Sequence, residues 1–359
     1  MNGQEIELKF GMIGAYTGLK EVLESIGTIE SEHTDNLKNI YFDTNKRDFF
    51  AMQAGVRIRK ANEYVEQTLK IRDSNLAGVH VRNEYNVRID DSATKPDLSL
   101  FPLDAFPDGT DIAQLQKKLR MDCELDFVRQ SFDFRFEDAL FEVSYDQGGI
   151  IYEGGKYPIN ELEVELKEAS VTEKSLLEIF LALIKALAKK GVPLTLEPFS
   201  KMHKATLLLR NERNLIRLPD TGPQNVRDFI VGLMIVFEKM AGLLLVKQNL
   251  AVLGYISYTL KALDKALKEL KHEIKRLAPK DEATALLLEI KDLRLTLKRM
   301  YRYLHALEGE FLNVAFAVDA REIAYTIEVL RVKISKTKLY MLPLRIRVLL
   351  NKIESFTNN

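Results

Sequence analysis

Two short runs carry acidic side chains at alternate positions. In the first, EIELKF, charged residues alternate with Ile6, Leu8 and Phe10. The second, NELEVELKE, has the same period of two. Alternate residues of a β-strand point to opposite faces, so each run places its acids on one face. These acids are Glu5, Glu7, Glu161, Glu163 and Glu165.

The strands expected between these runs carry mainly basic residues on the equivalent face. They are Arg57, Arg59, Lys70, Arg72, Arg82 and Arg129, with Glu84 and Asp146 among them, and Lys9 adds a base to the first acidic run itself. For any one strand, a solvated face is the ordinary explanation of such alternation. Rows of like charge repel one another, however. Several such rows in succession therefore indicate that counterions lie opposite them.

Acidic and basic rows of this kind predict phosphoryl chemistry. Carboxylate oxygens are hard ligands that suit Mg²⁺ or Mn²⁺, which proteins bind together with substrate phosphates. Arginine and lysine suit phosphate oxygens, and arginine can hold two of them at once. A metal between the acids and a ring of bases would together hold a polyanion of several linked phosphates.

The period of two predicts the elements that must position these side chains. It runs from Gln4 to about Lys167 and indicates antiparallel strands with one covered face. A polar row on every strand cannot face an apolar core, but it can line a water-filled barrel whose outside is covered by helices. Short helices are expected at 16–26 and 111–119. A longer amphipathic helix is expected between Thr172 and Gly191.

The second part of the chain has a helical period. The stretch RLPDTGPQNV is rich in proline and glycine and predicts a boundary between domains at 1–212 and 224–359. Four or five long amphipathic segments follow, which favour an antiparallel helical bundle. The expected fold class is therefore α+β, with an antiparallel barrel clad by helices and then an all-α domain.

Composition places limits on function and location. The 359 residues include 52 Lys plus Arg and 52 Asp plus Glu, so net charge offers no bulk attraction to nucleic acid or membranes. The single cysteine, Cys123, fits a reducing compartment, and no signal peptide is recognised, so a cytoplasmic location is expected. The apolar run 229–246 holds Glu238 and Lys239 near its centre, each costing about 2.5–3.5 kcal/mol in a membrane. A buried bundle helix is the better interpretation.

Two other signals are weak. The run GGIIYEGGKY lacks a P-loop's first glycine, because Ile150 stands there, and has Tyr157 where serine or threonine is required. It is interpreted as a hairpin turn. The five histidines have no ligand spacing, so no zinc site is expected.

An ordered set of motifs resembles the CYTH domain of the triphosphate tunnel metalloenzymes over roughly the first 205 residues. The motifs are Glu5-x-Glu7-x-Lys9, YFDT, RIR (57–59), LKIR (69–72), RNE (82–84), Arg129, SYDQG with Asp146, ELEVELK, and SKMHKA with Lys201. ExExK alone would be a weak signal, but the whole set in order is a specific one.

This resemblance implies an eight-stranded tunnel that hydrolyses triphosphates with Mg²⁺ or Mn²⁺. Glu5, Glu7, Glu163 and Glu165 would hold the metal, with Glu161 as an additional member. The phosphate-binding residues would be Lys9, Arg57, Arg59, Lys70, Arg72, Arg82, Arg129 and Lys201. Asp146 and Glu84 would orient basic side chains, coordinate a second metal or position water. The expected mechanism is in-line attack by metal-activated water on a terminal phosphorus, without a serine or cysteine nucleophile.

The helical half resembles the CHAD domain that accompanies some CYTH domains. The residues concerned are Arg294, Lys298, Arg299 and Arg302, and then Arg331, Lys333, Lys336 and Lys338. Such helices can present a basic face to polyphosphate. The alternative is a solvated basic face on a structural bundle, or on one that forms a homo-oligomer.

The leading hypothesis is hydrolysis of inorganic triphosphate to pyrophosphate and phosphate. A thiamine or nucleoside triphosphatase and a class IV adenylyl cyclase are alternatives on the same fold. A non-catalytic polyphosphate or nucleotide sensor is the alternative from another class. Two acidic strands argue against the sensor, because binding a polyanion needs few carboxylates.

Overall fold

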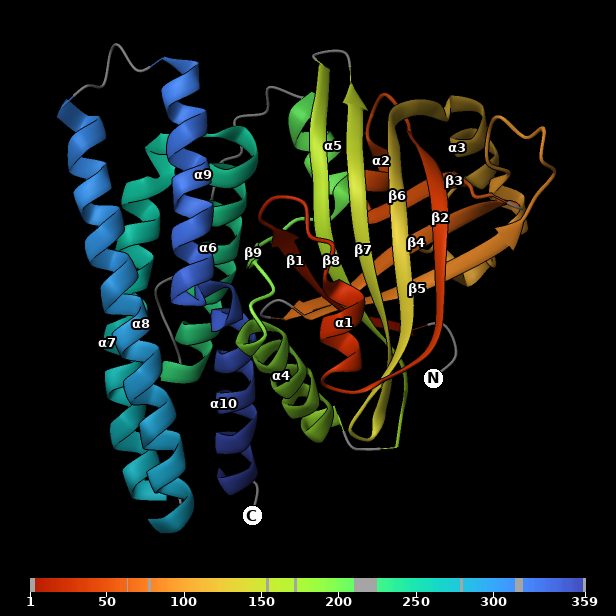
Figure 1. The fold of residues 1–359 in the computed structure, drawn as a ribbon. Coiled ribbons are helices and arrows are strands. Elements are labelled where there is room, and N and C mark those ends of the chain that lie inside the picture. Colours follow the sequence, from red (N-terminus) through yellow and green to blue (C-terminus); the bar gives the residue numbers. More distant parts are fainter. Residues whose placement is uncertain are drawn as a thin grey trace.

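The structure of the protein, a computed structural model, describes residues 4–62, 64–76, 79–152, 155–170, 173–209, 225–277, 280–313 and 319–357. Side chains at the edges of these ranges, including those of Gln4, Glu5, 72–76, 79–82 and 173–175, are not described. Strands dominate as far as Ala169, and helices dominate beyond it (Figure 1).

The strands form one antiparallel sheet in the described part of the chain. They are β1 Gln4–Met12, β2 Thr28–Asp43, β3 Ala54–Lys60, β4 Val65–Leu76, β5 Val79–Arg88, β6 Arg120–Phe136, β7 Ala139–Tyr152, β8 Gly155–Ala169 and β9 Leu194–Leu196. Their order is β5-β4-β3-β2-β6-β7-β8-β1-β9, and β1 also pairs with β5. When the short strand β9 is left aside, β5 and β1 stand at the two ends of this order, and their pairing joins those ends.

The strand count differs from the expected eight. The ninth strand, β9, has only three residues and pairs with Phe10, Gly11 and Met12 at the end of β1. A segment this short shows no readable period, which is why alternation did not reveal it. The run interpreted as a hairpin turn does join β7 to β8, with Tyr152 opposite Gly155.

The apolar face of the sheet is covered by helices, as the alternation predicted. Leu8 and Phe10 of β1 and Leu162 of β8 are buried in the main core, together with α4 (Glu173–Lys189). Phe180 of α4 meets Phe141 of β7 edge to face, with ring centroids 5.0 Å apart. Since this face is occupied by hydrocarbon, the charged face of the same strands points to the other side.

A second apolar cluster covers the outer face of β3 and β4. Val56, Ile58 and Leu69 pack there against Leu98 and Phe101 from the connection between β5 and β6. That connection contains η1 (Leu98–Leu100), η2 (Leu103–Ala105) and α3 (Ile112–Lys118). Two further short helices, α1 (Leu19–Glu24) and α2 (Asp48–Ala51), flank β2.

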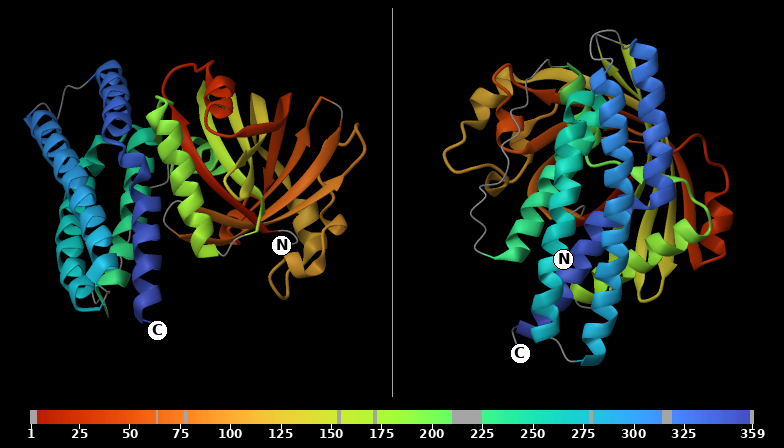
Figure 2. Two further views of the ribbon diagram at one scale, coloured as in Figure 1. Left: turned by 60° about the horizontal axis from the view of Figure 1, so that its bottom comes forward. Right: turned by 90° about the vertical axis from the view of Figure 1, so that its left-hand side faces the viewer.

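The helical region lies beside the sheet (Figures 1 and 2). It contains α6 (Val226–Lys247), α7 (Leu253–Leu277), α8 (Lys280–Asn313), α9 (Ala320–Thr337) and α10 (Leu342–Thr357), with η3 (Leu250–Val252) and η4 (Leu339–Met341) at two of the connections. The helix α5 (Lys201–Leu209) stands between it and the sheet. The expected boundary stretch, 213–223, lies outside the described residues.

Helix α6 is long and apolar enough to cross a membrane by length and composition alone, and it is the one such helix in the described ranges. In this structure 67% of its most apolar stretch is buried. Met234, Phe237 and Met240 contribute to the main core, which is continuous from α4 to the helical region. The burial agrees with its interpretation as a core helix of the helical region.

Candidate active site

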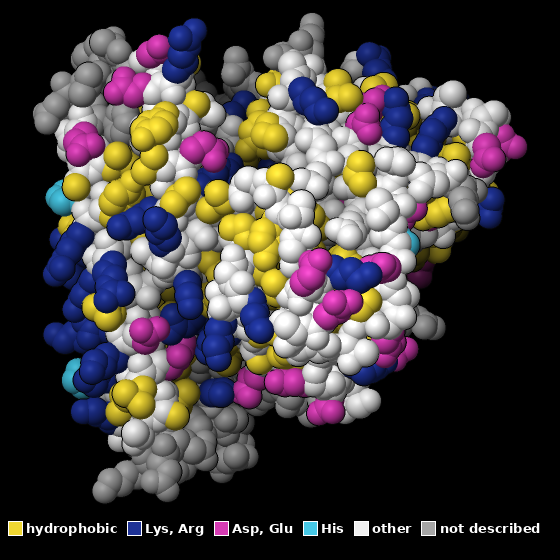
Figure 3. Space-filling view, viewed as in Figure 1, with side chains coloured by type: hydrophobic (Ala, Val, Ile, Leu, Met, Phe, Trp, Pro, Cys, Tyr) yellow, Lys and Arg dark blue, Asp and Glu magenta, His cyan; other side chains and the backbone are white. Residues whose placement is uncertain are grey.

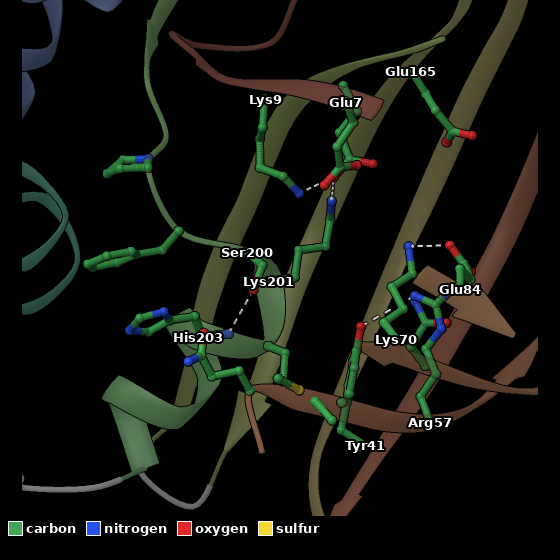
Figure 4. A pocket seen from close by; sticks show the side chains of 18 of the residues that line it. Glu7, Lys9, Tyr41, Arg57, Lys70, Glu84, Glu165, Ser200, Lys201 and His203 are labelled. Atoms are coloured by element: carbon green, nitrogen blue, oxygen red, sulfur yellow. Dashed lines mark hydrogen bonds and ion pairs between the residues drawn. The ribbon is translucent and has the colours of Figure 1, made fainter. Parts of the chain in front are cut away.

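A cavity of about 630 Å³ opens on the charged face of the sheet. Each strand from β1 to β8 contributes to its wall, as does α2, and α5 and α6 contribute from the helical side. Ten of the residues singled out by the sequence line it: Glu7, Lys9, Arg57, Arg59, Lys70, Glu84, Arg129, Glu163, Glu165 and Lys201. Figure 4 shows Lys9 and Lys201 directed to the acidic strands, with Arg57, Lys70 and Glu84 gathered across the cavity.

Five other expected residues are placed differently. Asp146 and Glu161 are fully buried and do not line the cavity. The side chains of Glu5, Arg72 and Arg82 lie outside the described ones, although their backbones belong to β1, β4 and β5. Glu5 is opposite Arg82 in the pairing of β1 with β5.

The register of β1 with β8 brings the two acidic strands together. Glu7 is opposite Glu165, and Lys9 is opposite Glu163. Residues directly opposite in an antiparallel pair share a face and lie within side-chain reach of each other. The two acidic runs, which are more than 150 positions apart in the chain, therefore meet on one surface, where Lys9 lies among the carboxylates.

Glu163 is the centre of an ion-pair cluster. Its carboxylate accepts from Lys9, from Lys201 Nζ at 2.7 Å and from Arg129 Nη2 at 2.5 Å. Burial alone would raise the pKa of Glu163, but Lys201, Lys9 and Arg129 outweigh it and hold that pKa well below its usual range. Glu163 is therefore a fixed anion near neutral pH.

Asp146 and Glu161 are buried behind the cavity wall, where they orient the basic side chains of Arg129 and Lys201. Arg129 donates twice to Asp146, from Nε and Nη2, both at 2.7 Å. Lys201 Nζ lies 2.6 Å from Asp146 and 2.9 Å from Glu161. Of the roles considered for Asp146, orientation of basic side chains is the one its contacts support. Burial lowers the pKa of Lys201, but these carboxylates more than reverse it, so Lys201 stays protonated.

The opposite wall of the cavity, formed by β3, β4 and β5, carries more basic than acidic side chains. Glu84 pairs with Lys70 at 2.7 Å and with Arg57 at 3.4 Å. Arg59 lies 3.5 Å from Glu66 and donates to Asn39 at 3.1 Å. Burial, and then repulsion from Arg57 and Arg129, lower the pKa of Arg59. Its positive charge is thus only partly offset by protein groups, which is the environment that an anionic ligand would stabilise.

Sequence reasoning missed several lining residues. Lys167 has the same parity as Glu163 and Glu165, and Glu142 has the same parity as Asp146, so the period of two could have revealed both. Lys167 lies 3.0 Å from Glu142 and 3.1 Å from Glu165. The remaining lining residues come partly from strands, where they are neutral and so did not stand out as rows of charge, and partly from loops and helices, where a period of two gives no signal. They are Asn39, Tyr41, Phe50, Gln53, Ala54, Gly55, Asn86, Phe127, Pro198, Phe199, Ser200, Met202, His203, Ile235, Glu238 and Lys239.

The sequence also gave no indication of a buried cluster beside the cavity, in which Lys204 contacts two glutamates. Lys204 of α5 is only 1% exposed and contacts Glu161, while its Nζ lies 2.9 Å from Glu197. Lys201 and Lys204 are three residues apart in α5 and so lie on one face of the helix. Both ammonium groups therefore reach the acidic strand β8. The resemblance had pointed to Lys201 alone.

The carboxylates on the cavity wall suit a divalent metal by their donor chemistry. Glu7, Glu163 and Glu165 offer hard oxygen ligands of the kind that Mg²⁺ and Mn²⁺ take. Among the described residues, no three acidic, histidine or cysteine side chains are grouped closely enough to hold a metal alone. Mg²⁺ commonly binds through one or two carboxylates together with substrate phosphates. Glu7 and Glu165, opposite each other, fit that arrangement.

Comparison with known proteins identifies the sheet region. Residues 3–195 match the CYTH domain. A curated relative named inorganic triphosphatase, from Haemophilus influenzae, is 30% identical over 175 residues, which are 47% of this chain and 47% of that protein. The chain thus spans about half the length of the curated relative that it matches. The helical region has no comparable match to the CHAD domain among these findings.

Solved structures of low similarity cover the same region. A Hippeastrum protein described as a candidate adenylyl cyclase with a dominant triphosphatase activity is 20% identical, with a TM-score of 0.43, over 57% of this chain and 97% of that one. A mimivirus capping enzyme triphosphatase is 13% identical, with a TM-score of 0.34, over 52% and 90% of the two chains. At these scores the structural likeness carries no argument about function.

The family assignment rests on the domain match, which covers more than half of the chain. It agrees with the acidic strands and the facing bases, and CYTH enzymes are in general dependent on divalent metals. The chain belongs to the CYTH domain family.

Proposed function

We propose that the protein hydrolyses the terminal phosphoryl group of a linear triphosphate, with inorganic triphosphate as its substrate and Mg²⁺ or Mn²⁺ as its cofactor. The observation that carries the proposal is a single cavity in which Glu7, Glu163 and Glu165 face a wall of arginines and lysines. A phosphate chain needs both, because cations neutralise its oxygens while carboxylates hold the metal.

The basic side chains would bind and orient the phosphate chain. Arg57, Arg59 and Lys70 line the wall opposite the acidic strands. Arg59 has the least compensated charge of the three, so it gains most from a phosphate. Arg129 and Lys201 would offset the charge that develops on the transferred group. Their positions are set by Asp146, which is buried against both.

Glu7 and Glu165 would hold the metal, with Glu163 close to them. When bound, a divalent metal supplies positive charge that polarises phosphoryl oxygens. Burial raises the pKa of Glu165, which Lys167 partly counteracts. In the overall reaction, water adds to the terminal phosphorus as the bond to the bridging oxygen breaks. Inorganic triphosphate and water thereby give pyrophosphate and orthophosphate.

The name of the Haemophilus influenzae relative supports inorganic triphosphate over an organic one. Cyclisation of ATP by an adenylyl cyclase would also need a site for adenine and activation of the ribose 3′-hydroxyl. The described residues give no specific indication of either. Hydrolysis therefore fits the described cavity better than cyclisation, and assays with nucleotides distinguish the two reactions.

We also propose that the helical region, 224–359, is a CHAD-like domain that binds polyphosphate. A hollow of about 490 Å³ between α7 and α8 is lined by Lys271, Lys275, Lys291, Arg294 and Lys298. Figure 3 shows lysine and arginine gathered along this part of the surface. Arg294 is already paired with Asp264 at 2.7 Å, so the other bases would make the contacts. We propose a cytoplasmic location for the protein, with neither a membrane nor nucleic acid as a partner.

The proposal is tested by phosphate release from inorganic triphosphate, ATP and thiamine triphosphate, with Mg²⁺ or Mn²⁺. The variant is Glu7→Gln, and the control is Glu124→Gln, which removes a carboxylate that pairs with Lys38 away from the cavity. Metal-dependent release that is fastest from inorganic triphosphate, lost in Glu7→Gln and kept in the control, is expected. Tight binding without turnover of any substrate would instead identify a sensor, and cyclic AMP from ATP would identify a cyclase.

A further inference from the structure

The charged residues of helix α6 occupy an unusual place. The helix is strongly apolar, yet Glu238 and Lys239 lie near its middle. Together with Ile235, one turn earlier, both line the cavity that the strands form. Ile235 is 53% exposed, although the adjoining Met234 and Val236 are buried. This part of α6 therefore faces the cavity, and it comes from outside residues 3–195, which make up the CYTH domain.

Helix α6 is fitted closely to the segment that enters α5. The ring of Phe199 lies against Gly242, where any Cβ would collide with it. Phe199 also stacks on His203 of α5, with ring centroids 4.2 Å apart and an interplanar angle of 14°. Because α5 also carries Lys201, one set of contacts joins α6 to the base at the centre of the site.

Lys239 differs from the other cations of the cavity. Seven of these have a carboxylate partner: Lys9, Arg57, Arg59, Lys70, Arg129, Lys167 and Lys201. Within the described ranges, Lys239 has no ion pair, and its side chain is exposed. A cation that already has a carboxylate partner contributes less net attraction to a polyanion than one that does not.

We propose that Lys239 is a phosphate-binding residue and that the substrate site is shared between the CYTH domain and α6 of the helical region. The inference rests on the proposed function only in taking the ligand to be a linear phosphate chain. Lysine acts at phosphates as a point charge on a flexible stem, which suits a helix that approaches the cavity from the side. Without α6 the cavity would lack this wall and this charge.

The test compares two charge reversals in the full-length chain, Lys239→Glu and Lys268→Glu. Lys268 is an exposed lysine of α7 that does not line the cavity, so it controls for net charge. Binding of inorganic triphosphate is measured by calorimetry in EDTA, where the metal-dependent reaction cannot proceed. We expect Kd to rise about tenfold for Lys239→Glu at low salt, as for one charged hydrogen bond, and less than about twofold for Lys268→Glu.

The effect of Lys239→Glu should shrink as salt is added, because the interaction is electrostatic. Equal Kd values for the two variants would overturn the inference, whether or not the protein turns over triphosphate. If only Lys239→Glu raises the Kd, and the wild-type protein does not turn over triphosphate, the shared binding site is supported and the proposed hydrolysis is rejected. If Lys239→Glu lowers Tm, Lys239→Gln decides the question by the same comparison, because it removes the charge without introducing an acid.

Discussion

Lys201 Nζ lies 2.7 Å from Glu163 Oε1, so the first residue of helix α5 contacts the middle of the acidic strand β8. The two residues are 38 positions apart and both are almost completely buried. This pair joins the helical cover of the cavity to its charged wall. It also places an ammonium group among three carboxylates that would otherwise repel one another.

Replacing Lys201 by methionine is expected to destabilise the fold. It would leave Asp146, Glu161 and Glu163 with less positive charge in a buried site. Removing one partner of a buried ion pair typically costs about 3–5 kcal/mol. Urea unfolding measures this loss. The matched control is Lys268→Met on the surface of α7. If the two variants unfold alike, within about 0.5 kcal/mol, the cluster does not contribute to stability in this way.

The cluster also predicts how stability depends on pH. The pKa of Glu163 is lower in the folded protein than its ordinary value, so the unfolded chain binds this proton more readily. The stabilisation is complete above the unfolded pKa of about 4.3 and is lost as pH falls through the folded value. Unfolding free energies from pH 6 down to the lowest pH at which the protein refolds should fall less steeply in Glu163→Gln than in the wild type. Parallel curves would contradict the assignment.

Arg59 is expected to matter for binding more than for folding. Burial and the neighbouring Arg57 and Arg129 disfavour its charge. Arg59→Met should therefore raise the Kd for inorganic triphosphate about 10- to 100-fold, from the loss of charged hydrogen bonds. Its Tm should stay the same or rise, because the substitution removes a charge that burial and two neighbouring arginines disfavour.

Arg129→Met provides the contrast. Arg129 is held by two hydrogen bonds to buried Asp146. This variant should lose Tm as well as affinity, because Asp146 would lose a partner. Similar losses of Tm in the two variants would show that Arg59 is a structural residue.

The contact between Phe199 and Gly242 predicts opposite outcomes for two glycine substitutions. Gly242→Ala would push the new methyl group into the Phe199 ring, and overpacking of this kind costs about 1–3 kcal/mol. Gly309 of α8 has nothing within 4 Å of its Cβ position, so Gly309→Ala should stabilise the helix by about 0.5–1 kcal/mol. Thermal unfolding measures both. A shift of the same sign in both variants would show that α6 does not dock through Phe199.

Activity gives a second readout for the Gly242 substitution. If α6 forms a wall of the substrate site, Gly242→Ala should also raise the KM for inorganic triphosphate at temperatures where the variant remains folded. Gly309→Ala should leave KM unchanged, because Gly309 does not line the cavity. A destabilised Gly242→Ala protein with the wild-type KM would separate docking of the helix from substrate binding.

Periodicity predicted the faces of the strands but not the depth of each residue. Glu161, Glu163 and Glu165 have one parity and were grouped as metal ligands. The fold buries Glu161 between Lys201 and Lys204, while Glu163 and Glu165 line the cavity. Alternation cannot distinguish these positions, because the depth of a residue depends on what packs over that part of the strand. Here α5 covers one part and leaves the rest open.

The sequence by itself determined the family, the two acidic strands and the basic strands between them, because a period of two assigns each side chain to a face. The tertiary structure decided which charges meet. The pairing of β1 with β8 set Glu7 against Glu165, and the helical cover brought Lys201 and Lys239 to the cavity. Such contacts join segments far apart in the chain. They follow from the register of strands and the docking of helices, which a local pattern does not encode.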